Sequence, residues 1–174
     1  MSALTALKIA LSVPIGIGLA YPFFSPEAPR GFLGELQMVG PLGAALGIGV
    51  FLFLVYLYAR DLVLTLERVS PAARRFKPGR VWLMFLLPYN FVEDFFIVEG
   101  VARSLQAEAA LHPELARYKS HGRVSGIGWC AAQVLSLLPN DIGAAAGGVA
   151  LGFWIWHWRF IRRVNAALAA SPRG

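Results

Sequence analysis

The sequence predicts an all-α integral membrane protein, a helical bundle of about four spanning helices with one further re-entrant or interfacial helical segment. Hydrophobic residues make up 57% of the 174 residues, charged residues make up only 15%, and the mean hydropathy is positive. A soluble chain of this length could not hide that much apolar surface in one core. Because the polar connections are too short to fold separately, we expect a single membrane domain over residues 1–174.

The first two predicted spans cover residues 4–24 and 38–59, each near the roughly 20 residues that a helix needs to cross a bilayer. In the first, Lys8 precedes a short apolar run that ends in small residues up to Ala20, a pattern that also fits a cleaved signal peptide. We interpret it as a retained span. Its Pro14 is tolerated where neighbouring helices satisfy the backbone.

The stretch LLPYNFVEDFFIVEG belongs to a segment, residues 81–105, that either re-enters the membrane or lies at its interface. Pro88 and Asn90 interrupt it, and non-helical backbone at membrane depth must be covered by protein or water. After Asn90 the pattern predicts an amphipathic helix with Glu99 and Arg103 as an i, i+4 pair.

The last apolar stretch, residues 127–158, is too long for one crossing. As a single helix it would measure about 48 Å, against a hydrocarbon core of roughly 30 Å. Pro139 disfavours helical geometry at the preceding residue, and Asn140 or Asp141 can cap a new helix. We therefore expect a tight hairpin with spans at residues 124–138 and 141–159.

The distribution of Lys and Arg predicts the topology, because basic residues near span ends stay on the cytoplasmic side. Four single crossings would place eleven of the sixteen basic residues in the cytoplasm. A re-entrant segment followed by a hairpin places fifteen there, with only Arg30 outside. We expect both termini and the loops at residues 60–80 and 103–123 to be cytoplasmic.

A basic stretch, a Pro-Gly-x-Val-Trp motif, an apolar run with Pro and Asn, and a helix closing on Ser-Leu-x-Ala-Glu follow one another in the middle of the chain. The positions that form this pattern are Pro78, Gly79, Val81, Trp82, Pro88, Asn90, Ser104, Leu105, Ala107 and Glu108. Through them, residues 52–164 resemble a family of small bacterial multi-span membrane proteins without an assigned function. The resemblance implies a bacterial inner (cytoplasmic) membrane location and no activity. The chain departs from the family pattern at Glu93 and Asp94, where apolar or aromatic residues are expected.

Three carboxylates, Glu93, Asp94 and Glu99, are candidates for an ion or proton pathway, since ionisable groups at membrane depth often face such pathways. The alternative is that they lie at headgroup level on an interfacial helix. Asp94 fits that alternative least, because it projects close to the apolar stripe of the helix.

Small and aromatic residues indicate packing surfaces and membrane interfaces. Glycines four residues apart let helices approach closely, within the chain or in an assembly. Tryptophans gather where a membrane meets water. The predicted packing glycines are Gly43, Gly47, Gly143, Gly147, Gly148 and Gly152, and the predicted anchors are Trp82, Trp154, Trp156 and Trp158.

No cofactor or metal is predicted. Cys130 is the single cysteine, and His157 is the only histidine in an apolar segment, where we considered and set aside haem or metal ligation. The net charge of +6 comes without a nucleic-acid-binding motif. Catalytic motifs are also missing from the sequence, so we expect no enzymatic activity.

These features predict a non-catalytic accessory or scaffolding subunit of a larger inner-membrane assembly. Its expected partners are membrane lipid and either other membrane subunits or further copies of the chain. The alternative is a small oligomeric transporter or an ion or proton pathway that uses Asp94 and the neighbouring carboxylates.

Overall fold

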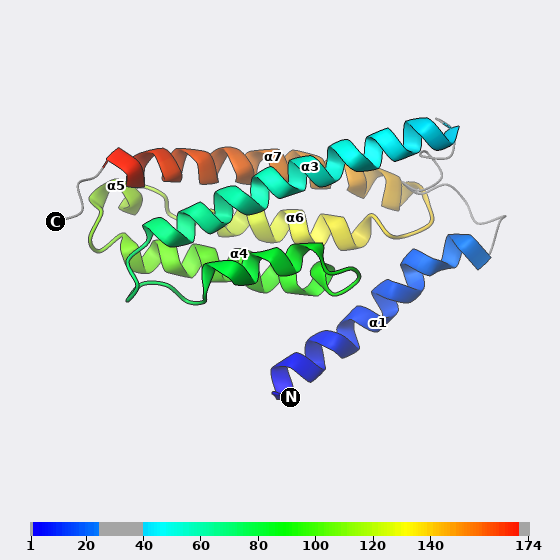
Figure 1. Ribbon diagram of the computed structural model, residues 1–174, viewed down its shortest axis with the longest axis horizontal. Coiled ribbons are helices and arrows are strands. Elements are labelled where there is room, and N and C mark those ends of the chain that lie inside the picture. Colours follow the sequence, from blue (N-terminus) through cyan, green and yellow to red (C-terminus); the bar gives the residue numbers. More distant parts are fainter. Residues whose placement is uncertain (1, 25–39, 171–174) are drawn as a thin grey trace.

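A computed structural model describes residues 2–24 and 40–170, and these ranges contain helices and no strand, which confirms the all-α prediction. Helices α3, α4, α6 and α7 lie along the long axis of the molecule, and α1 is inclined to them (Figure 1). The helices are α1 (Ala3–Phe24), α3 (Gly40–Arg68), the 3₁₀ helix η1 (Pro78–Phe85), α4 (Asn90–Glu108), α5 (Pro113–Ala116), α6 (Arg123–Leu135) and α7 (Asp141–Ala170).

Two of the described helices are long and apolar enough to cross a membrane: α1 over Ala3–Tyr21, and α3. Only 11% of the most apolar window of each is buried inside the molecule. Helix α6 has 13 residues and measures about 20 Å, less than the hydrocarbon core. By length and composition the described helices therefore support two spans, whereas the sequence predicts four.

Helix η1 and α4 form a hairpin whose tip lies near Pro88. The loop before η1 is tied to the end of α4, because Ser70 donates two hydrogen bonds to Glu108 Oε2, from its backbone N at 3.0 Å and its Oγ at 2.6 Å. The segment thus leaves at the end of the bundle where it entered (Figure 1). Its tip reaches α1, where a Cβ on Gly16 would lie 3.3 Å from Pro88 Cγ. This is the path that the re-entrant alternative describes.

The turn between α6 and α7 lies within the last apolar stretch, where the sequence predicts a hairpin. Asn140 caps α7 by accepting a hydrogen bond from the Gly143 backbone N at 3.1 Å. A Cβ on Gly143 would lie 1.9 Å from the Leu138 carbonyl oxygen, so the turn can close only around glycine.

The hydrophobic core fills one end of the bundle and leaves the other end open. Fully buried side chains come from α3, α4 and α7, among them Leu62, Ile97 and Ile161. In contrast, the first half of α3 exposes its large apolar residues, with Leu42 74% and Leu46 63% exposed. An exposed apolar surface of this extent requires lipid or another protein to cover it.

Polar contacts join α3 to α7 at the closed end. Asn165 Nδ2 donates to the Asp61 carbonyl oxygen at 2.9 Å, and Thr65 Oγ1 donates to Asn165 Oδ1 at 3.1 Å. Arg68 Nη1 donates to the Asn165 carbonyl oxygen at 2.8 Å. These bonds add directional contacts to the apolar packing of the two longest helices, which includes Leu66 and Val164.

Candidate functional site

Glu93, the first of the three predicted carboxylates, is the centre of a buried ion-pair cluster. Its side chain is 0% exposed and lies 2.5 Å from Lys8 Nζ and 2.6 Å from Arg80 Nη2. The Lys8 ammonium also lies 3.7 Å from the centroid of the Phe96 ring. The cluster therefore joins α1, η1 and α4, and Glu93 has two cationic partners within the chain.

This cluster fixes the position of α1, the helix with the fewest neighbours in the bundle. Burying an ion pair removes its members from water, and the cost is recovered only when the charges stay together. Separating α1 from α4 would take Lys8 away from Glu93 and leave Glu93 with Arg80 as its remaining partner. Their pairing consequently selects one arrangement of the helices.

Asp94 lies on the opposite side of α4 from the solvent, 2% exposed. Its Oδ1 has no hydrogen-bond partner among the described residues, and neither has Oδ1 of Asn90 one turn earlier. Asp94 is close enough to Tyr58 and Cys130 to interact with both electrostatically. The structure thus places Asp94 in the core of the bundle, separate from the Glu93 cluster.

Tyr58 is the centre of an aromatic cluster beside Asp94. It is fully buried, its Oη lies 2.8 Å from His157 Nδ1, and its ring packs edge-on against Trp129 and Trp154. His157 is therefore a hydrogen-bonding core residue. The described part of the chain brings together no group of three or more His, Cys, Asp or Glu side chains that could hold a metal ion.

Glu99, the third carboxylate, binds two arginines. Arg103 Nε lies 2.6 Å from its Oε1, which confirms the predicted i, i+4 pair, and Arg123 Nε lies 2.8 Å from its Oε2. The second contact joins α4 to the start of α6. Glu99 is 28% exposed on its side chain, so this cluster is partly solvated and contributes little to stability.

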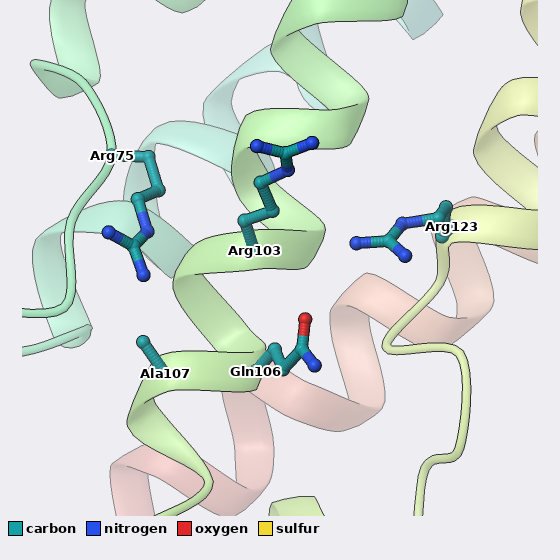
Figure 2. Close-up of a pocket in the computed structure, with 5 residues that line it drawn as sticks. All are labelled: Arg75, Arg103, Gln106, Ala107 and Arg123. Carbon is teal, nitrogen blue, oxygen red and sulfur yellow. The ribbon is translucent and has the colours of Figure 1, made fainter.

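The two Glu99-bound arginines also line a cavity of about 550 Å³ together with Arg75, Gln106 and Ala107 (Figure 2). Figure 2 shows Arg123 extending from the start of α6 toward α4, Arg103 lying along α4, and Arg75 on the side of α4 away from Arg123. Glu99 binds two of the three arginines, so its single carboxylate balances one of their three positive charges.

His121, next to Arg123 in sequence, adds no charge to this region at neutral pH. Burial, and secondarily the positive charge of Arg123, lower the pKa of His121. Its backbone has a positive φ of 48°, followed by Gly122 at 83°, so the two residues form the turn that starts α6.

The predicted packing glycines divide into two groups. A Cβ on Gly147 would touch Ser136 at 3.8 Å, and Gly143 closes the α6–α7 turn, so both pack inside the chain. Gly148 and Gly152 have no atom within 4 Å of a would-be Cβ. Gly43 is half-buried and Gly47 exposed in the open part of α3.

The tightest helix contacts involve glycines that the sequence analysis did not select. A Cβ on Gly126 would lie 2.1 Å from Val98 Cγ1 and 3.0 Å from His157 Nε2, and one on Gly100 would lie 2.4 Å from the Phe76 ring. Gly126 therefore sets the close packing of α6 against both α4 and α7.

The four predicted tryptophan anchors differ in how exposed they are. Trp82 and Trp156 are on the surface, 40% and 56% exposed, where an interfacial residue belongs. The prediction of an interfacial anchor is wrong for Trp154, because this residue is only 5% exposed and packs in the Tyr58 cluster. Trp158 is half-buried and donates a hydrogen bond to Asp61 Oδ2 at 2.7 Å.

Comparison with protein families, curated proteins and solved structures finds no match to the chain. The family resemblance seen in the sequence therefore stays an expectation.

Lys8, Arg80 and Tyr58 are site residues that sequence reasoning missed. Lys8 was interpreted as a topology signal, yet its ammonium is buried against Glu93. One signal was available: a lone cation in one apolar segment and an unexpected acid in another suggest a pair, since charges at membrane depth seek each other. Tyr58 gave no such signal, because a tyrosine in an apolar helix is common.

Proposed function

We propose that the chain is a non-catalytic integral membrane protein that packs, as an accessory or scaffolding subunit, against other transmembrane helices in a bacterial inner-membrane assembly. The observation that carries this proposal is the open end of the bundle. There, α1 and the first half of α3 expose apolar side chains, among them Val13, Ile17 and Val50 at 56%, 64% and 60%.

The polar residues support the same proposal. Two of the three candidate pathway carboxylates, Glu93 and Glu99, are bound by cations of the chain itself, so their role is to hold helices together. The closed end carries the basic loops and the polar α3–α7 contacts. A membrane over the open end would leave these groups at the cytoplasmic surface, as the charge distribution predicts.

In the proposed topology α1 and α3 cross the membrane, the η1–α4 hairpin re-enters from the cytoplasmic side, and the α6–α7 hairpin completes four spans. Both termini are then cytoplasmic. Helix α6 is short for a full crossing, so residues 136–140 of the turn, which include the exposed Pro139, extend the path to the far interface.

Affinity purification in a mild detergent tests the proposal. We expect one or more membrane proteins, or further copies of the chain, to elute with it in a fixed ratio. Gly49→Leu should lower their recovery, because Gly49 is exposed on α3 with no atom near its would-be Cβ, and a leucine there would hold a partner helix away. Elution of the wild type as a lone monomer would contradict the proposal.

One observation favours a second function, a proton or cation pathway. Among the described residues, two buried oxygens on the same face of α4, Asp94 Oδ1 and Asn90 Oδ1, have no hydrogen-bond partner, and such atoms can bind a cation or a water chain. Liposomes containing the purified chain and a pH-sensitive or cation-sensitive dye would test it. A wild-type flux that Asp94→Asn abolishes would establish the pathway, whereas the scaffold proposal expects no flux.

A further inference from the structure

A second cavity, of about 640 Å³, lies between the α5–α6 loop and the face of α7. Four cationic side chains line it, Arg117 and Lys119 from the loop and Arg159 and Arg163 from α7, and no acidic side chain does. Arg117 is partly engaged, since its Nη2 donates to Tyr118 Oη at 2.8 Å. In the cavity of Figure 2, by comparison, Glu99 binds two of the three arginines and balances one positive charge.

The wall on α7 changes from apolar to basic along one stripe. Gly152, Trp156, Arg159 and Arg163 recur every three or four residues and so share one face of the helix. Gly152 leaves open space over the helix backbone, and Trp156 is 56% exposed. A basic end, an interfacial tryptophan and an apolar groove follow each other over about 16 Å.

The order of basic, aromatic and apolar surface along α7 matches the headgroup, interface and acyl chain of a phospholipid. Phosphate groups are bound by Arg and Lys, and basic pockets between spans on the cytoplasmic side recognise anionic headgroups. The acyl chain of a lipid held there would run along α7 toward the open end of the bundle, past Trp156 and over Gly152. A free phosphate would use the basic end alone and leave the apolar half without a role.

We propose that this cavity binds an anionic phospholipid, with the headgroup phosphate on Arg159 and Arg163 and one acyl chain along the Gly152 groove. The site rests on the membrane location in the proposed function, and it does not require a protein partner.

Native mass spectrometry of the detergent-purified full chain, titrated with phosphatidylglycerol, tests the site. The wild type should retain phosphatidylglycerol and bind phosphatidylcholine of the same acyl chains less tightly. Arg159→Gln with Arg163→Gln should weaken phosphatidylglycerol binding about twenty-fivefold, because each basic residue near an anionic lipid contributes a factor of about five.

The matched control is Arg162→Gln with Arg60→Gln, which removes the same charge from exposed residues outside the cavity. The control should leave the affinity for phosphatidylglycerol unchanged. Size-exclusion profiles identical to wild type would show that both double variants fold, which is expected because all four arginines are exposed.

Three results would overturn the site: equal binding of the two lipids, equal losses in the cavity and control variants, or binding of soluble glycerol phosphate as tight as that of the lipid. The last would identify a free anion as the ligand. A chain that purifies without protein partners but retains phosphatidylglycerol would contradict the proposed scaffold function and leave the lipid site standing.

Discussion

Two adjacent acidic residues, Glu93 and Asp94, have opposite surroundings in the folded chain. Glu93 has two cations within 2.6 Å, and Asp94 has an oxygen without a partner. Both are almost fully buried, so the difference comes from their direction on α4 alone. One residue along a helix is a rotation of about 100°, which turns Glu93 toward α1 and η1 and Asp94 toward α3 and α6.

Substitutions of Glu93 and Asp94 test this difference in surroundings. Glu93→Gln should destabilise the chain by about 3 kcal/mol, because it leaves the buried Lys8 ammonium without its counter-ion. Asp94→Asn should leave the stability unchanged or raise it, because the amide keeps the shape of a buried carboxyl whose Oδ1 has no hydrogen-bond partner among the described residues. Thermal unfolding in detergent measures both effects. Equal destabilisation by the two variants would show that Asp94 also has a stabilising partner.

The sequence anticipates part of this site. Asp94 is anomalous already in the helical pattern, because it projects beside the apolar stripe of residues 91–105. The Glu99–Arg103 pair follows from i, i+4 spacing, which is a local property of a helix. In contrast, the Lys8–Glu93 contact joins positions 85 residues apart, and no local pattern reports such a distance.

At the level of helices, the contacts are set by glycines in α6 more than by those in α7. Gly126 sits between α4 and α7, and a Cβ there would overlap Val98. A Cβ on Gly148 would have no described atom within 4 Å. Spacing by four picks out Gly148 and Gly152 in α7, but the same spacing joins Gly122 to Gly126. Sequence alone does not say which small residues meet a neighbour.

Replacing Gly126 or Gly148 by leucine, one at a time, should have different effects on folding. Gly126→Leu should reduce the yield of folded monodisperse protein strongly, since leucine would collide with α4 and α7 and overpacking of this kind costs about 1–3 kcal/mol or more. Gly148→Leu should keep the wild-type melting temperature. Fluorescence-detected size exclusion after heating compares the two. A wild-type profile for Gly126→Leu would mean that α6 packs less closely than the structure shows.

The boundaries of the helices follow the sequence where a local signal exists. Asn140 caps α7 as its side chain predicts, whereas α6 ends at Leu135, before the predicted end at residue 138. Helices α3 and α7 extend beyond the predicted spans, which end at residues 59 and 159, to Arg68 and Ala170. The helical turns beyond residues 59 and 159 are charged on one face and buried on the other. A span predicted from hydropathy alone therefore ends before the helix does. Packing against each other, through Thr65 and Asn165, sustains them.

For the whole molecule, the division into a closed polar end and an open apolar end predicts how it lies in a membrane. The α5–α6 loop belongs to the closed end, because α5 packs against α4 and α7 there (Figure 1). The α6–α7 turn lies at the opposite end, beside the start of α3 (Figure 1). The two loops should therefore face opposite sides of the bilayer.

Single-cysteine labelling measures this orientation once Cys130 is replaced by serine. A cysteine at the exposed Ser120, in the closed-end loop, should resist a membrane-impermeant maleimide in intact cells and react after the membrane is opened. A cysteine at the exposed Pro139, in the opposite turn, should react in intact cells. The positive charge near Ser120 drives this difference, since Arg117, Lys119 and Arg123 favour the cytoplasm. Strong labelling of the Ser120 position in intact cells would require residues 81–105 to cross the bilayer. The η1–α4 hairpin, which returns to the end where it entered, would then have to open in the membrane.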